Sequence, residues 1–301
     1  MTTRPGFDTK SLGCRTDSPD FRATGRVFRD TRRALCALPL ASLAACALPP
    51  GRGAGPGIEA FEPLLAAPHR RPANVARDRY RHPADTLAFF GVSRDSAVVE
   101  ILPGSAGYYM EILAPWLRDR GRYIAASRDE TAPARYLADH RRLLERLAAE
   151  PRLYDQVLVT KFNADRHAIA PPASADFVLT FRNLHNWVER GEAEGALRAF
   201  HRALKPGGIL GVVDHRGRND LSQQAQMASG YLREDFAIAL IERAGFRLAG
   251  RSEVNANPRD TKDHPEGVWT LPPALRLKER DRDRYLAIGE SDRFTLKFEK
   301  A

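Results

Sequence analysis

The 301-residue chain is predicted to form one α/β domain, with a mostly parallel sheet and helices on both faces of the sheet. Two observations support this fold class. From about residue 58 onward, short apolar runs alternate with stretches in which apolar residues recur at the spacing of one helix face. No internal repeat interrupts this alternation, and strands that alternate with helices pair in parallel in a single sheet.

The elements of the first half follow one another in strand–helix order. The run AVVEIL at 97–102 is predicted as a buried strand, and YYMEILAPWLRDRG (108–121) as a helix with one apolar face. A second strand is expected at 122–126. A helix covers 136–150 and ends at Pro151, and a third strand covers 154–162.

The second half continues the same pattern. ADFVLTF at 175–181 is the fourth predicted strand, and the next helix stops at Pro206-Gly207-Gly208, a helix end and turn that leads into the strand ILGVVD (209–214). Another amphipathic helix at 233–246, the segment 247–254 and an alternating strand at 293–300 complete the domain.

The net charge of +9 does not mark a nucleic-acid surface. Residues 1–33 carry eight Lys/Arg and four Asp/Glu, and the rest of the chain mixes 39 basic with 34 acidic residues. No block of five or six like charges occurs, which favours a solvated surface. The partner we expect is a small molecule, not a nucleic acid.

The N-terminal segment is typical of an exported protein. Arg32 and Arg33 precede an uncharged run of about a dozen residues, which is too short to span a membrane and contains Pro39. The run ends in Leu43-Ala44-Ala45-Cys46, which resembles the lipobox of bacterial lipoproteins. An ordinary disordered leader is the alternative, and the protein would then be cytoplasmic.

These features predict three regions. Residues 1–46 are expected to be a leader ending at Cys46, and residues 47–84 a flexible tether and N-terminal extension. Residues 85–301 are expected to form the α/β domain. Cleavage before Cys46 would leave one cysteine and therefore no disulfide. The membrane would be contacted only through a lipid on Cys46, on the periplasmic side.

Expression in a bacterium should therefore yield a membrane-associated product with a lipidated Cys46 at its N-terminus, and Cys46→Ser should abolish the lipid. Intact-mass measurement checks both statements. An unprocessed chain in the cytoplasm would contradict the lipobox.

The loop after the first strand marks a candidate binding site. In open α/β sheets, ligands bind beyond the carboxyl ends of the strands where the strand order reverses. Gly104 and Gly107 can let a ligand approach the backbone, although Ser105 and Ala106 stand where a second glycine is expected. The spacing is not G-x-G-x-x-G, which disfavours a nicotinamide-dependent oxidoreductase.

Four segments together resemble the class I S-adenosylmethionine-dependent methyltransferases: Glu100 near the end of the first strand, the loop PGSAG (103–107), ADFVLTFRNLHNW (175–187) and ALKPGGILGVVD (203–214). The closing RYLAIGESDRFTLKFEK (284–300) is similar to the terminal antiparallel hairpin of that fold. The resemblance covers roughly 85–300. FRNLHNW, with NPRDTKDHPEGVWTLPP (257–273), looks like an uncharacterised bacterial branch of predicted methyltransferases.

The resemblance implies a seven-stranded Rossmann-like sheet and S-adenosyl-L-methionine as cofactor. It implies that the cofactor contacts Glu100, Pro103, Gly104, Ser105, Gly107 and Tyr108. The family usually has an acid after the second strand, where this chain has Ser127, and Asp129 could replace it only if the turn bends back. After the third strand Asn163, with Asp165 nearby, stands in for the acid that contacts adenine, and an amide oxygen can accept the same hydrogen bond.

Polar residues after the fourth and fifth strands are the candidates for chemistry. The fourth strand is followed by Arg182, Asn183, His185, Asn186 and Trp187, where donor and acceptor would meet, although a helix cap with a packed Trp is the alternative. Of these, Arg182 and Asn183 are expected to contact the cofactor. His185 could act as a general base, because a histidine pKa lies near neutrality, or could make a structural hydrogen bond. Asp214 and His215 end the fifth strand and are catalytic candidates, His215 as a second possible base and Asp214 as the group that orients an imidazole. Adjacent strand residues point in opposite directions, however, so the two need not touch.

Other kinds of site are disfavoured. Asp214, His215 and His264 could bind a metal on paper, but no metal-ligand spacing is present, so no metal is expected. No G-x-S-x-G motif supports a serine hydrolase. The polar segment 257–269 could be a lid or an ordinary surface loop.

Methyl transfer to an unknown acceptor is the function the sequence favours. Export conflicts with it, because the methyl donor is made in the cytoplasm. An exported binding protein that has kept the fold without catalysis is the alternative, favoured by Ser127, whereas the polar cluster at 182–187 favours an enzyme.

Overall fold

A computed structural model describes residues 57–163 and 167–301. The predicted leader and Cys46 lie outside these residues, as do Asp165 and residues 47–56 of the predicted tether and N-terminal extension. Within the described ranges, no helix is both long and apolar enough to cross a membrane.

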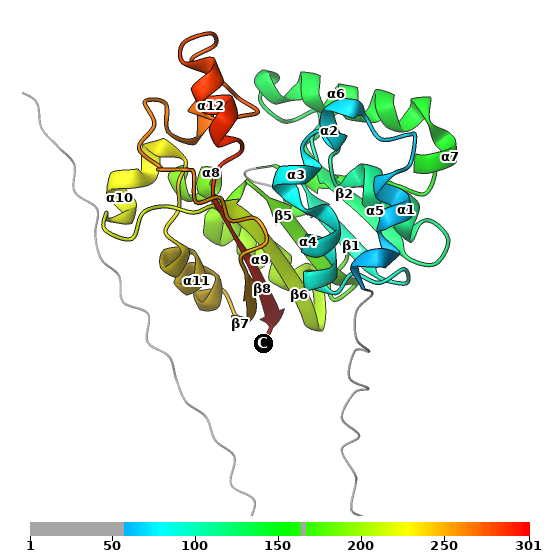
Figure 1. The fold of residues 1–301 in the computed structure, drawn as a ribbon. Helices are drawn as coiled ribbons and strands as arrows, with labels where there is room; N and C mark the ends of the chain where they lie inside the picture. Colours follow the sequence, from blue (N-terminus) through cyan, green and yellow to red (C-terminus); the bar gives the residue numbers. More distant parts are fainter. Residues whose placement is uncertain (1–56, 164–166) are drawn as a thin grey trace, which may run out of the picture. The chain divides into compact units, whose positions relative to one another are not determined.

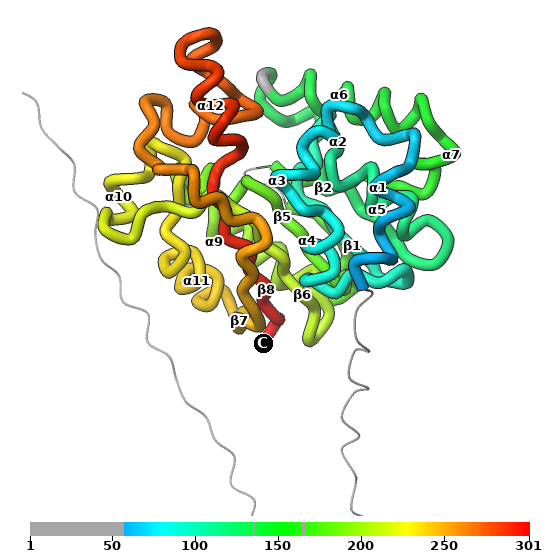
Figure 2. The backbone as a smooth tube through the Cα atoms, in the orientation of Figure 1, coloured from blue at the N-terminus to red at the C-terminus, as the bar shows by residue number. Residues whose placement is uncertain are grey.

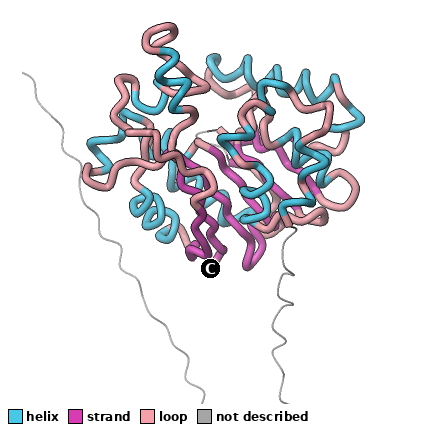
Figure 3. Tube along the Cα trace, in the orientation of Figure 1, coloured by secondary structure: helices cyan, strands magenta, loops and turns pink. Residues whose placement is uncertain are grey.

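In the described part of the chain, eight strands form one sheet in the order β4-β3-β2-β1-β5-β6-β8-β7. Their bounds are β1 (Ala97–Ile101), β2 (Arg122–Ser127), β3 (Leu158–Phe162), β4 (His167–Ala168), β5 (Ala175–Phe181), β6 (Leu204–His215), β7 (Phe246–Ser252) and β8 (Arg293–Lys300). Strands β3, β2, β1, β5 and β6 are parallel to one another. Strand β4 pairs antiparallel with β3, and β8 pairs antiparallel with both β6 and β7. The sheet is the central layer in Figure 3.

Helices cover both faces of this sheet, as predicted (Figure 1). They are α1 (Glu62–Leu65), α2 (Pro72–Val75), α3 (Asp78–Arg81), α4 (Pro83–Phe90), α5 (Met110–Leu117), α6 (Ala134–Ala149), α7 (Pro151–Tyr154), α8 (Leu184–Glu189), α9 (Ala193–Ala203), α10 (Gln223–Gln226), α11 (Glu234–Arg243) and α12 (Arg282–Ile288). Short 3-10 helices lie at Ile58–Ala60, Met227–Ser229 and Gly267–Thr270.

Two apolar clusters form the core, one on each face. Side chains of α8, α9 and α11 pack on one face, where Trp187, Phe200 and Ile241 are buried. Side chains of α4 and α5 pack on the other face, with Leu87 and Ile112 fully buried. The continuous apolar strands that the sequence shows are therefore covered on both sides, as parallel strands require.

Three details differ from the prediction. The sheet has an eighth strand, β4, which was not predicted because it is only two residues long and carries no detectable pattern. The antiparallel C-terminal pair is confirmed, but its first strand is β7, and residues 282–288 form α12. Strand β6 begins at Leu204, and its register with β5 shifts between the pairs at Leu204 and Ile209, so the Pro-Gly-Gly segment is an irregularity within the strand and not a turn before it.

Helices α1 to α4 belong to the folded body, and α1 lies beside α5 in Figure 2. Phe61 is fully buried and its ring packs on Trp116, with ring centroids 4.6 Å apart. Asn74 donates to the carbonyl of Ala106 at 2.9 Å, which fixes the loop after β1. The part of the predicted N-terminal extension that the structure describes therefore builds one wall of the candidate site.

Candidate functional site

The site lies where β1 and β5 end side by side. β1 leads to α5 on one face of the sheet and β5 leads to α8 on the other, which makes this the topological switch point of the sheet. Leu102 and Arg182 directly follow these strands, and both have left-handed backbone conformations, with φ of 52° and 62°. Such a conformation costs a residue with a side chain roughly 1–2 kcal/mol. Strain of this kind gathers at functional sites, and here two strained residues line one cavity.

Two cavities open at this switch point, with volumes of about 260 Å³ and 190 Å³. Leu102 and Asn183 line both of them. The amide of Asn183 donates to the carbonyl of Ile101 at 3.1 Å, so the wall between the cavities ties the end of β5 to the end of β1. Small-molecule pockets span about 300–1,000 Å³, a range that neither of these cavities reaches alone but that the two reach together.

The larger cavity lies on the α6 side of the loop. It is lined by Leu102, Gly104, Ser127, Arg128, Tyr136, Asp139, His140, Asn183, Asn186, Trp187 and Arg190. Asp139 supplies the one carboxylate among these residues and accepts a hydrogen bond from the backbone N–H of Ser105 at 3.1 Å. The sequence places Ser127 correctly at this cavity but does not reveal Asp139, since on a charged helix face it looks like any solvated acid.

Asp129 does not bend back to replace the missing acid. Its carboxylate accepts from the amide of Asn163 at 2.6 Å and pairs with Lys161 at 3.1 Å. Hydrogen bonds from Thr131 and Asn163 hold the pKa of Asp129 far below its usual range despite some desolvation. Neither Asp129 nor Asn163 lines the two cavities, but the amide oxygen of Asn163 is buried without a hydrogen-bond partner in the described part of the chain.

The two glycines of the loop have different roles. A Cβ on Gly104 would meet only a carboxylate oxygen of Asp139, at 3.5 Å, so this glycine faces the larger cavity. A Cβ on Gly107 would lie 2.7 Å from both Arg146 and Met110. Gly107 lines neither cavity, and a side chain on it would disrupt packing in the interior, so its predicted contact with a cofactor stays a prediction.

The smaller cavity is built from charged and aromatic groups. Its lining residues are Arg77, Arg81, Glu100, Ile101, Leu102, Pro103, Ala106, Tyr108, Tyr109, Phe181, Arg182 and Asn183. Five predicted site residues thus meet here, namely Glu100, Pro103, Tyr108, Arg182 and Asn183. The Tyr108 hydroxyl donates to Asp78 at 2.6 Å, so its ring lines the cavity while its hydroxyl anchors the loop to α3.

Glu100 is the buried acid of this cavity. It accepts a hydrogen bond from the Tyr123 hydroxyl at 2.6 Å. Burial raises the pKa of Glu100 to about 7, since the Tyr123 hydrogen bond and the charge of Arg81 offset only part of the desolvation. A carboxyl group with this pKa changes charge close to neutral pH, and a cationic partner would stabilise its ionised form.

His185 and Asp214 form a buried pair. Nδ1 of His185 lies 2.7 Å from Asp214, and Nε2 lies 2.8 Å from the amide nitrogen of Asn186. Asp214 is fully buried and also accepts from the backbone N–H groups of His185 and His215, at 3.2 and 2.8 Å. As predicted from the sequence, these residues lie at the same edge of the sheet. The Asp214 carboxylate contacts the ring of His185, whereas it contacts only the backbone of the adjacent His215.

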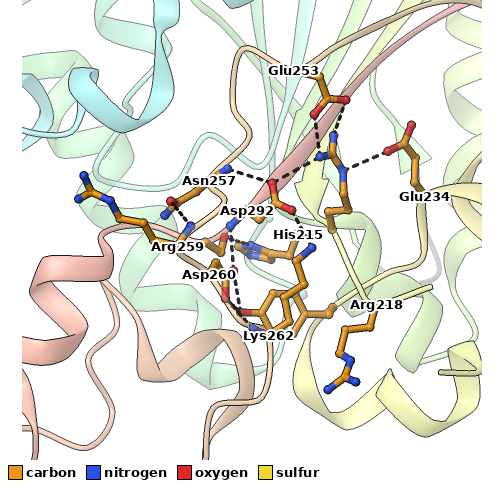
Figure 4. Close-up of polar contacts among 12 residues, drawn as sticks. His215, Arg218, Glu234, Glu253, Asn257, Arg259, Asp260, Lys262 and Asp292 are labelled. Carbon is orange, nitrogen blue, oxygen red and sulfur yellow. Dashed lines mark hydrogen bonds and ion pairs between the residues drawn. The ribbon is translucent and has the colours of Figure 1, made fainter. Parts of the chain in front are cut away.

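His215 points into a different polar network (Figure 4). Its Nδ1 lies 2.6 Å from the hydroxyl of Ser291. Burial lowers the pKa of His215 well below its usual value, and the nearby charges of His185 and Arg182 lower it further. His215 is therefore neutral at neutral pH and a weak proton acceptor.

The segment 257–269 is anchored by buried acids. Asp260 accepts from the Tyr231 hydroxyl at 2.9 Å and from the backbone N–H of Asp292 at 2.8 Å. Asp292 also pairs with Lys262 at 2.8 Å (Figure 4). These contacts fasten the segment to the start of β8.

One group among the described residues could hold a metal ion. It consists of His185, Asp214 and His215, whose candidate ligand atoms lie within 4.8 Å of one another. His264, the third residue considered from the sequence, instead pairs with Asp260 at 2.8 Å. The His185–Asp214 hydrogen bond already joins two members of this group.

The comparisons with known proteins concern the fold. No family model matches the sequence, and no curated protein matches it. A solved structure of a SAM-dependent methyltransferase from Aquifex aeolicus is similar, with a TM-score of 0.52 and 17% identity over 77% of this chain and 95% of that one. A putative sarcosine dimethylglycine methyltransferase from Galdieria sulphuraria also gives a TM-score of 0.52, with 14% identity over 76% and 86% of the two chains. The chain therefore has the Rossmann-like class I methyltransferase fold, as the sequence predicts.

Proposed function

We propose that this protein is an S-adenosylmethionine-dependent methyltransferase that acts on a small-molecule acceptor, in the bacterial branch that the FRNLHNW motif resembles. One observation carries the proposal: two cavities meet at the switch point, with a buried carboxyl group in one and a loop glycine and a carboxylate in the other. This arrangement suits a long ligand with a nucleoside at one end and an ammonium group at the other.

The residues present fit the two ends of such a donor. At the larger cavity, Asp139 and Ser127 offer oxygen atoms to the hydroxyl groups of a ribose. At the smaller cavity, Glu100 offers a buried carboxyl group to an ammonium group. The unpartnered amide oxygen of Asn163 remains an acceptor beyond β3. When bound, S-adenosylmethionine supplies an electrophilic methyl group on a positively charged sulfur.

The chain's contribution is alignment and proton removal. Asn183 fixes the spacing between the strand ends, which sets the relative positions of donor and acceptor. Asp214 accepts a hydrogen bond from the Nδ1–H of His185, which leaves the lone pair on Nε2, where the Asn186 amide donates. An acceptor hydroxyl or amine that displaces this amide could pass its proton to His185.

Calorimetry of the full chain with S-adenosylhomocysteine at several pH values tests the proposal. Ionised Glu100 attracts the ligand ammonium, and protonated Glu100 does not. With a pKa of about 7, the ionised fraction rises from about a tenth at pH 6 to about nine-tenths at pH 8, so affinity should rise about tenfold over this range. Glu100→Gln should bind more weakly and lose this pH dependence.

The same substitution gives an internal control on folding. The folded-state pKa of Glu100 lies above its ordinary value of 4.5, so this residue stabilises the fold at low pH and loses that contribution as the pH rises through 7. Glu100→Gln should therefore unfold at a higher temperature than wild type at pH 8. Absence of any binding at millimolar S-adenosylhomocysteine and S-adenosylmethionine would contradict the proposed function.

A further inference from the structure

Four arginines gather around one acid at the smaller cavity. Glu290 accepts hydrogen bonds from Arg77 at 2.6 Å, from Arg81 at 3.1 Å and from Arg293 at 3.0 Å. The charges of all four groups act on Arg182, whose backbone N–H donates to Val213 at 2.7 Å but whose guanidinium has no hydrogen bond or ion pair with a described residue. Arg77, Arg81 and Arg182 line the cavity itself.

The positive charge of this cluster is not balanced. Burial opposes ionisation of Glu290, but the charges of Arg81, Arg293 and Arg77 outweigh it and lower its pKa to about 2. Burial and the other arginines lower the pKa of Arg182 to about 9, which still leaves it charged at neutral pH. Four cations and one anion give a surplus of three positive charges, and a fully ionised Glu100 would remove only one.

Buried nitrogen atoms in the cluster also lack partners. Arg81 is 5% exposed, and its Nη2 has no hydrogen-bond partner in the described part of the structure. Nη2 of Arg77 and Nε of Arg293 are likewise buried without a hydrogen-bond partner among the described residues. A buried charged donor without a partner costs free energy, and several such donors around one cavity indicate a ligand that accepts hydrogen bonds.

The methyl donor does not supply the missing negative charge. Its carboxylate can pair with one guanidinium, but its ammonium and sulfonium groups carry two positive charges, so the donor as a whole is a cation. Binding the donor therefore raises the surplus positive charge at the switch point. A second ligand with a net negative charge would lower it.

We propose that Arg77, Arg81 and Arg182 bind an anionic group, a carboxylate or a phosphate, of the methyl acceptor. This inference rests on the proposed function and adds the substrate class. Arg182 presents a guanidinium that can form two parallel hydrogen bonds to such an oxyanion. The bound anion orients the acceptor, and a different atom of the acceptor receives the methyl group, because pairing with arginine makes the oxyanion a poorer nucleophile.

The test is calorimetry of the full chain saturated with S-adenosylhomocysteine, with inorganic phosphate and succinate as separate probes. Wild type should bind at least one probe. Arg182→Gln should weaken that binding at least about tenfold, because one charged hydrogen-bonding partner is removed. Arg182→Lys should restore part of it. Arg198→Gln is the matched control, since Arg198 is exposed on α9 and pairs with Glu194.

The outcomes separate the possible sources of the anion. If the cluster holds the donor's own carboxylate, Arg182→Gln weakens S-adenosylhomocysteine but not 5′-methylthioadenosine, which lacks the amino acid, and the probes compete with S-adenosylhomocysteine. That result overturns the acceptor assignment. Absence of probe binding to the saturated protein also overturns it and leaves the proposed function standing. Failure of S-adenosylhomocysteine to bind removes both proposals.

Discussion

Replacing Asp214 with alanine is expected to lower the free energy of unfolding by about 3–5 kcal/mol, because a fully buried charged partner is removed. The carboxylate accepts from the His185 ring and from two backbone N–H groups, and all three donors would be left buried without it. Asp214→Asn should cost less, since an amide oxygen can still accept some of these bonds.

Urea unfolding followed by circular dichroism measures this loss. Asp235→Ala is a suitable control, because Asp235 makes an exposed ion pair with Arg233, and such pairs contribute about 0–1 kcal/mol. A loss below about 1 kcal/mol for Asp214→Ala would show that the buried network does not form as described.

Replacing His185 with alanine is expected to lower turnover by about 10²-fold or more, with donor affinity nearly unchanged. A general base acts mainly in the transition state, so kcat falls while binding of the donor persists. Release of S-adenosylhomocysteine is the readout, first in a screen of anionic acceptors and then for the variant. His185 is 5% exposed, so the variant's fold is checked by circular dichroism.

Two further variants identify the role of His185. His201→Ala is the control, because His201 lies on α9 and packs against Phe246, away from the switch point. Asn186→Ala removes the donor to Nε2 and leaves the imidazole in place, so it should retain far more activity than His185→Ala. Turnover within about threefold of wild type for His185→Ala would leave this histidine a structural role only.

The sequence predicted the sheet well because parallel strands are buried on both faces and appear as continuous apolar runs. The same reasoning fails at Leu102. An apolar residue that follows AVVEI looks like one more strand position, but the strand ends at Ile101 and Leu102 turns left-handed. No property of leucine signals this, since glycine is the residue that usually takes such a conformation.

The candidate site was only partly predictable. Residues at or just after the carboxyl end of a strand, such as Glu100, Ser127 and Arg182, could be placed because topology brings strand ends together. Asp139, Arg77 and Arg81 could not be placed in this way. Their segments are rich in both charges and resemble solvated helix faces, and only tertiary packing shows which charges turn inward.

The arginine cluster also has a consequence for how the molecule forms. Arg77 and Glu290 are 213 residues apart in the chain, so their contact is among the least local in the protein. Contacts that close such long loops form late, because the entropy of loop closure must be overcome first. Helix α3 is synthesised early, but Arg81 cannot pair with Glu290 until the segment just before β8 has been synthesised. Ligand binding at the smaller cavity should therefore be the last property to appear on refolding, after the parallel strands have paired.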